Sequence, residues 1–177
     1  MCLCLGPSKS GKTMLLKKLR GDKIDESTQT IQTDGVNIYR VRNSDKRYDI
    51  MIRELGGNMA PTWNQHLEKV QKVMYVVDTS NLCQISAAGV LLYSLLIEPK
   101  LETANFALIL TKMDLSYRQM RNEALLMLHF FRLQKEVHQK ITVFETSGVS
   151  GQGIEELRDW IFDPISMANL IRPTKNT

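Results

Sequence analysis

Close to its start, the 177-residue chain reads Gly6-Pro-Ser-Lys-Ser-Gly-Lys-Thr13. This stretch fits the pattern G-x-x-x-x-G-K-S/T, in which a glycine-rich loop surrounds the phosphates of a nucleotide. Residues 2–5, just before the loop, are apolar and predict a strand, and residues 13–20, just after it, predict a helix. A loop between a strand and a helix predicts a phosphate site at the helix N-terminus. A chance glycine-rich turn is the alternative, and the flanking elements argue against it.

The residues of this loop have separate predicted roles. Backbone N–H groups of the loop and of the first helical turn point at phosphate oxygens. Gly11 lets the backbone come close, Lys12 reaches the β- and γ-phosphates, and the hydroxyl of Thr13 binds Mg²⁺. Pro7 has no N–H and cannot donate. The predicted phosphate-binding residues are Gly6, Lys9, Ser10, Gly11, Lys12 and Thr13.

Short apolar runs alternate with helical stretches along the rest of the chain. Further strands are predicted at residues 37–42, 48–53, 73–77, 106–110 and 141–144, and further helices at 85–97, 118–137 and 153–161. The first two of these strands form a hairpin, and the polar residues 21–34 form an exposed loop. The order predicts a three-layer α/β fold with a mostly parallel six-stranded sheet and one antiparallel edge strand. We expect one domain at residues 1–171 and a short polar tail at 172–177.

The composition excludes several classes of protein. Hydrophobic residues make up 43% and charged residues 24%, which is typical of a globular domain. A net charge of +4 is too small to indicate direct nucleic-acid binding. The longest apolar run, near residues 87–97, is too short to span a bilayer, and Cys2 excludes N-myristoylation. We therefore expect a cytoplasmic protein without a transmembrane or myristoyl anchor, associated with membranes or organelles only transiently and through partners.

Two later segments indicate which base is bound. Thr111-Lys-Met-Asp114 follows the predicted strand 106–110, and its carboxylate can accept hydrogen bonds from N1–H and the exocyclic amino group of guanine, a donor pair that adenine lacks. Glu145-Thr-Ser-Gly148 follows strand 141–144 and can offer a backbone N–H to the guanine carbonyl. Each segment alone also suits an ordinary polar turn, but together they favour guanine. The predicted base-site residues are Thr111, Lys112, Asp114, Ser147 and Gly148.

Two segments between the loop and the base motifs carry a family resemblance. Gln32-Thr-Asp-Gly-Val-Asn-Ile38 resembles a P-T-x-G-x-N first switch, and Arg53-Glu-Leu-Gly-Gly-Asn58 resembles a W-D-x-G-G-Q second switch. These are motifs of the Arf-like (ADP-ribosylation-factor-like) branch of the Ras-like small GTPases, and the resemblance covers residues 1–161. It implies a P-loop G-domain that binds GTP or GDP with Mg²⁺. It also implies that Thr33 binds Mg²⁺ and the γ-phosphate, and that Gly57 donates its N–H to the γ-phosphate.

The chain departs from the family at positions that matter for hydrolysis. Asn58 stands where the family has the glutamine that orients the attacking water, and its side chain is one methylene, or ~1.5 Å, shorter. Glu54 stands where an aspartate holds the water shell of Mg²⁺, so the predicted metal-site residues are Thr13, Thr33 and Glu54. Asn58 is the one catalytic candidate. These departures predict GTP hydrolysis that is slow or dependent on a partner.

Three functions remain open at this point. The first is a monomeric regulatory switch whose GTP form binds a protein effector, served by an exchange factor and a GTPase-activating protein. The second is a scaffold that stays bound to GTP or is indifferent to the nucleotide, because Asn58 and Glu54 weaken the chemistry. The third is a P-loop kinase or ATPase, which the guanine-type segment at residues 111–114 argues against.

Overall fold

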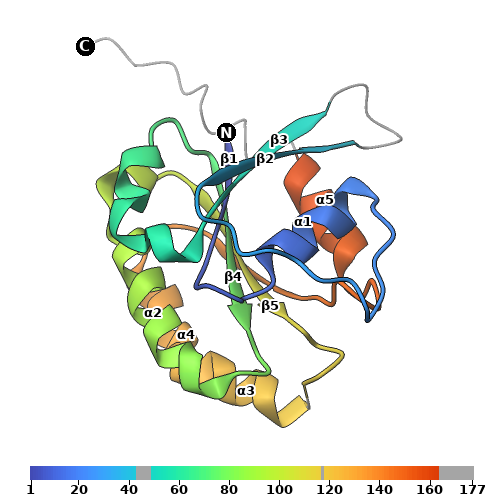
Figure 1. Ribbon diagram of the computed structural model, residues 1–177. Coiled ribbons are helices and arrows are strands. Elements are labelled where there is room, and N and C mark those ends of the chain that lie inside the picture. Colours follow the sequence, from blue (N-terminus) through green and yellow to red (C-terminus); the bar gives the residue numbers. More distant parts are fainter. Residues whose placement is uncertain (43–48, 117, 164–177) are drawn as a thin grey trace, which may run out of the picture.

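The computed structural model describes residues 1–42, 49–116 and 118–163, and Figure 1 shows how their elements are arranged. The strands are β1 (Cys2–Leu5), β2 (Val36–Val41), β3 (Ile50–Leu55), β4 (Lys72–Asp78), β5 (Asn105–Thr111) and β6 (Ile141–Glu145). The α-helices are α1 (Lys12–Arg20), α2 (Leu82–Leu96), α3 (Arg118–Met127), α4 (Phe130–Glu136) and α5 (Ile154–Phe162). Two 3₁₀ helices, η1 (Gly57–His66) and η2 (Pro99–Leu101), complete the described elements.

The six strands form one sheet in the order β2-β3-β1-β4-β5-β6. β2 pairs antiparallel with β3, and the other neighbours pair parallel. The predicted fold class is therefore confirmed, including the single antiparallel edge strand. Because β1, β3, β4, β5 and β6 run in the same direction, their carboxyl ends meet at one edge of the sheet, where α/β proteins bind ligands.

Helices cover both faces of the sheet, with α1 and α5 on one face and α2, α3 and α4 on the other (Figure 1). Each face has its own apolar cluster: Leu15 and Leu157 belong to one, and Leu92 and Leu128 to the other. β1 and β4 are buried along their whole length because both faces are covered. Cys2 and Cys4 lie in this core, and burial raises the pKa of Cys2 to about 12.

The predicted single helix at residues 118–137 is wrong. The chain forms two helices, α3 and α4, separated at His129, whose backbone is left-handed with φ 50°. The predicted helix at residues 85–97 begins three residues earlier, at Leu82. No helix within the described ranges is long and apolar enough to cross a membrane. The predicted hairpin connection at residues 43–46 and the predicted tail at 172–177 lie outside the described residues, so the domain limits stay predictions.

Candidate nucleotide-binding site

The loop between β1 and α1 has a backbone that glycine makes possible. Gly6 has φ +146°, and a Cβ there would lie 2.3 Å from the carbonyl oxygen of Val76. Gly11 also has a positive φ, +91°, at the start of α1. Both positions favour glycine, since side chains rarely adopt this backbone. The loop therefore approaches β4 closely and turns directly into the N-terminus of α1.

Lys12 is held at the centre of this loop. Its ammonium group donates hydrogen bonds to the carbonyl oxygens of Gly6, at 3.0 Å, and Pro7, at 2.8 Å. Desolvation by burial lowers the pKa of Lys12, and the nearby Glu54 acts in the opposite direction. No acid among the described residues forms an ion pair with Lys12. A largely buried cation of this kind is suited to an anionic ligand such as a phosphate.

Ser10, in the same loop, carries a polar group without a partner. Its side chain is fully buried. Among the buried side-chain nitrogen and oxygen atoms of the described residues, its Oγ alone makes no hydrogen bond. Buried hydroxyl groups normally have a partner. An orphaned hydroxyl beside a phosphate loop fits a site that is completed by a ligand.

Three side chains predicted for the metal site lie together beside the loop. The hydroxyl of Thr13 donates to Oε1 of Glu54 at 2.5 Å and lies 3.3 Å from the hydroxyl of Thr33. Asn37 joins them, because its amide donates to Thr33 at 3.3 Å and to Oε2 of Glu54 at 3.4 Å. The Glu54 side chain is fully buried and forms no ion pair with another described residue.

This donor set fits Mg²⁺. Mg²⁺ prefers oxygen ligands and is usually held by one or two carboxylates together with substrate phosphates and water. Two hydroxyl groups and one buried carboxylate next to a phosphate loop supply that kind of site. Within the described ranges no group of three His, Cys, Asp or Glu residues could hold a metal ion. Phosphate oxygens and water would therefore complete the coordination.

The base-site segments meet at the carboxyl ends of β5 and β6. Ser147 donates from Oγ to Oδ1 of Asp114 at 2.5 Å, and Ser150 N–H donates to Ser147 Oγ at 3.0 Å. These bonds orient the Asp114 carboxylate before any base arrives. Thr111 replaces the family's asparagine, and its hydroxyl lies 2.7 Å from the carbonyl oxygen of Ser10 and 3.0 Å from that of Val77. A hydroxyl has one hydrogen, so Thr111 can satisfy one of these carbonyls at a time.

Most of the predicted site residues line one cavity of about 450 Å³. The cavity walls include Lys9, Ser10, Gly11, Lys12, Thr13, Thr33, Glu54, Gly57, Thr111, Lys112, Asp114 and Gly148. Gly6, Ser147 and Asn58 do not line it; Gly6 and Ser147 instead support residues that do. Four further residues line the cavity but belong to no predicted motif: Thr30 and Ile31 in the predicted exposed loop, and Leu115 and Val149 beside the base motifs. Their nearness to the motifs was the only signal available.

The two switch segments contact the phosphate loop and each other. A Cβ on Gly57 would lie 2.1 Å from the backbone nitrogen of Ser8, and a Cβ on Gly56 would lie 2.2 Å from the carbonyl oxygen of Thr33. Gly56 N–H also donates to the carbonyl of Gly35 at 3.0 Å. Only glycine allows such close packing, so backbone contact explains why residues 56 and 57 of the second switch are glycines.

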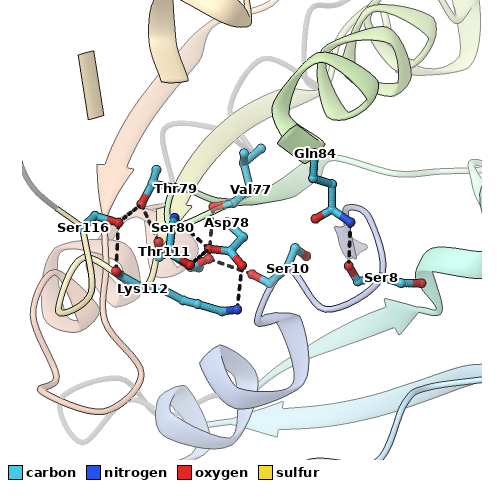
Figure 2. Close-up of polar contacts among 10 residues, drawn as sticks. All are labelled: Ser8, Ser10, Val77, Asp78, Thr79, Ser80, Gln84, Thr111, Lys112 and Ser116. Atoms are coloured by element: carbon cyan, nitrogen blue, oxygen red, sulfur yellow. Dashed lines mark hydrogen bonds and ion pairs between the residues drawn. The ribbon is translucent and has the colours of Figure 1, made fainter. Parts of the chain in front are cut away.

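Asn58 turns towards the loop. Its Oδ1 accepts a hydrogen bond of 2.6 Å from the hydroxyl of Ser8. On the other side, Gln84 of α2 donates to the carbonyl oxygen of Ser8 at 3.2 Å (Figure 2). Ser8 therefore connects the second switch to α2, and the side-chain oxygen of Asn58 is engaged by the protein itself.

The comparison with known families agrees with this geometry. The model of the ADP-ribosylation factor family matches residues 1–165. The chain belongs to this family. The family relatives include ADP-ribosylation factor-like protein 16 of Homo sapiens, 31% identical over 169 residues that cover 91% of this chain and 84% of the relative. ADP-ribosylation factor-like protein 2 of Dictyostelium discoideum is 31% identical over 165 residues, with 92% and 85% covered.

A solved structure supports the same fold. The Arl6 BBS3 small GTPase of Trypanosoma brucei, with the bound nucleotide analogue GppNp, matches with a TM-score of 0.78 and 18% identity. The match covers 94% of this chain and 96% of that one. The present chain therefore has the fold of a small GTPase.

Proposed function

We propose that the protein is a GTP-binding regulatory switch of the Arf-like type, which binds a protein effector in its GTP form. One observation carries the proposal: Thr33 and Gly57, from separate switch segments, line the same cavity as the phosphate loop. A γ-phosphate bound beside Lys12 would contact both segments and would be lost on hydrolysis. Mg²⁺ would be held by Thr13 and Thr33 with help from Glu54, and would neutralise phosphate charge.

Slow hydrolysis is part of the proposal. The side chain of Asn58 is one methylene shorter than the family's glutamine, and its Oδ1 accepts from Ser8 at 2.6 Å, so we expect its amide to fall short of a water at the γ-phosphate. The GTP form would then persist until a GTPase-activating protein supplied the missing group, and an exchange factor would reload the site. We propose a cytoplasmic monomer, brought to membranes only by its partners.

The proposed effector surface adjoins the first switch. Val36, Ile38 and Met51 project from the β2–β3 hairpin with exposed side chains, and Ile31 is 92% exposed. Ile31 also lines the nucleotide cavity, and it precedes the first switch segment directly in the chain. Exposed apolar side chains that are grouped next to a switch suit a partner that recognises one nucleotide state.

The second candidate function is a scaffold that is indifferent to its nucleotide. Two contacts favour it: Asn58 is bonded to Ser8, and Glu54 is bonded directly to Thr13. A scaffold of this kind would bind its partner equally well with GDP, with GTP or without a nucleotide, whereas a switch would prefer the GTP form.

The experiment that tests nucleotide binding uses Asp114. The nucleotide that co-purifies with the wild type is identified, and the binding of GDP, xanthosine diphosphate and ADP is titrated by calorimetry. Asn at position 114 offers an amide donor to the second carbonyl of xanthine, so Asp114→Asn should shift the preference towards xanthine by at least about tenfold. Asp159→Asn, an exposed change on α5, serves as the control. Co-purifying ATP would refute the guanine assignment, and an absence of nucleotide binding would refute the switch.

A further inference from the structure

Asp78 ends β4 and lies beside the base site without lining its cavity. Its carboxylate is 5% exposed, and both of its oxygens are engaged (Figure 2). Oδ2 accepts from the ammonium group of Lys112 at 2.6 Å. Oδ1 accepts from the backbone N–H of Ser80 at 2.9 Å and from its hydroxyl at 2.6 Å. The side chain is therefore held in one orientation, towards Lys112.

Lys112 is also held at its backbone. It has a left-handed φ of 59°, an arrangement that non-glycine residues adopt only where the surroundings stabilise it. Its carbonyl oxygen accepts from Leu115 N–H at 2.9 Å and from Ser116 Oγ at 3.1 Å. With Asp78 at the other end of its side chain, Lys112 is held at both ends.

The chain between β4 and α2 supplies a second contact to the same loop. Thr79 donates from Oγ1 to the carbonyl oxygen of Thr111 at 2.7 Å, and its hydroxyl lies 2.7 Å from that of Ser116. Figure 2 shows that these bonds and the Asp78–Lys112 pair join the two segments side by side. The base-site loop is therefore braced by residues 78–80, a segment that the sequence motifs do not include.

The position of Lys112 matters because its side chain forms a wall of the nucleotide cavity beside Asp114 and Leu115. A long lysine side chain free in solution samples many rotamers, and ordering it on binding costs conformational entropy. Asp78 orders it in advance. The buried carboxylate in turn needs Lys112, since an unpaired buried charge is unfavourable.

We propose that Asp78 is a positioning residue of the base site, which holds Lys112 as the wall against which the guanine base packs. This inference rests on the proposed guanine-nucleotide binding. Asp78 would act through Lys112 and would not itself touch the nucleotide. Its removal should therefore shorten the lifetime of the bound nucleotide only while Lys112 is present.

The test is the rate of GDP dissociation, followed with a fluorescent GDP analogue chased by excess GDP. Asp78→Asn keeps an oxygen that can accept from Ser80 but loses the charge that holds Lys112. We expect dissociation to become about tenfold faster, which corresponds to about 1.4 kcal/mol. The matched control, Glu68→Gln, likewise removes the charge from a lysine–acid pair, but at the surface pair with Lys100, which does not line the cavity, and should change the rate by less than about twofold.

A double-mutant cycle separates positioning from mere structural support. In a Lys112→Met background, Asp78→Asn should cause no further acceleration, because its target is gone and the substitution also removes a buried charge that has lost its partner. An equal acceleration in both backgrounds, or none in the wild type, would overturn the inference. Asp78→Glu, which keeps the charge but displaces it by a methylene, should give an intermediate rate and covers the case in which Asp78→Asn does not fold. Failure of the wild type to bind GDP at all would refute the proposed function instead.

Discussion

At the scale of single residues, the proposed slow hydrolysis of GTP is tested at Asn58, whose Oδ1 accepts from Ser8. Asn58→Gln lengthens the side chain by a methylene, so its amide can reach beyond Ser8 to a water at the γ-phosphate. Misplacement of a positioning group by about 1 Å costs on the order of 100-fold, so we expect a gain of that order in the single-turnover rate. The rate of phosphate release from GTP-loaded protein measures it.

Ser8→Ala provides the control for this experiment. It removes the hydroxyl that donates to Asn58 but leaves the asparagine too short. We expect hydrolysis to stay slow in this variant. If Ser8→Ala alone were as fast as Asn58→Gln, the hydrogen bond and not the side-chain length would be limiting. A wild type as fast as its Gln variant would contradict this explanation altogether.

Gly57 gives a second prediction at this scale. A Cβ at this position would lie 2.1 Å from the backbone nitrogen of Ser8, so Gly57→Ala pushes the second switch away from the loop. We expect the preference for GTP over GDP to fall by about tenfold or more, with GDP affinity little changed, because only the γ-phosphate contact is lost. Calorimetric titration with GDP and a non-hydrolysable GTP analogue measures both affinities.

Gly35→Ala is the matched control for Gly57→Ala. Gly35 lies in the first switch segment, and a Cβ there meets nothing within 4 Å. Its affinities for both nucleotides should match those of the wild type. Equal losses of GTP affinity in the two variants would mean that the close contact of Gly57 with Ser8 is not the cause.

At the scale of elements, the break between α3 and α4 is costly to the protein. His129 is exposed and left-handed, which for a residue with a side chain costs roughly 1–2 kcal/mol. Glycine relieves that cost but loses more entropy on folding, so we expect His129→Gly to stabilise by about 0.5–1 kcal/mol. For a chain of this size, the thermal midpoint should rise by roughly 1–4 °C. Calorimetry of the nucleotide-free protein is the measurement.

A glycine substitution within α4, the helix that follows His129, should change the stability in the opposite direction. Gln134 is exposed within α4, where glycine is a poor helix former, so Gln134→Gly should destabilise by about 1 kcal/mol. A fall in stability for both variants would show that the left-handed turn at His129 is not strained.

The same break shows why sequence periodicity has a limit. Apolar residues keep helical spacing on both sides of His129, so the pattern predicts one helix, and a single histidine is too weak a signal to predict a left-handed turn. The strands were predicted closely, because runs such as 73–77 and 106–110 are buried on both faces and bounded by polar residues. The spacing of apolar residues indicates which face of a helix is buried. A backbone turn at an exposed residue such as His129 does not change that spacing.

In the candidate site, the residues of contiguous motifs could be predicted from the sequence, whereas contacts between distant segments could not. Lys12, Thr13 and Asp114 were predictable because each belongs to a contiguous motif whose spacing reflects its chemistry. The contacts of Ser8 with Asn58, and of Asp78 with Lys112, join residues 50 and 34 positions apart. Only the order of the strands brings such partners together, so no local pattern could indicate them.

At the scale of the whole molecule, we expect the binding of nucleotide and Mg²⁺ to raise the stability of the fold. A ligand at 100 times its dissociation constant stabilises the native state by about 2.7 kcal/mol, which raises the midpoint of a chain of this size by roughly 5–11 °C. Part of that gain should depend on Mg²⁺, because Thr13, Thr33 and the buried Glu54 converge beside the phosphate loop. EDTA should therefore lower the midpoint of GTP-loaded protein and leave nucleotide-free protein unchanged.

Glu54→Gln tests whether the buried carboxylate is what makes the thermal midpoint depend on Mg²⁺. The amide can still accept from Thr13 but carries no charge, so the variant should keep much of its stabilisation by GTP and lose most of its sensitivity to EDTA. Glu68→Gln, which neutralises an exposed acid paired with Lys100, should behave as the wild type does. An EDTA effect that persists undiminished in Glu54→Gln would mean that Mg²⁺ is held by phosphates and hydroxyl groups alone. The chain's departure from aspartate at this position would then have no consequence for metal binding.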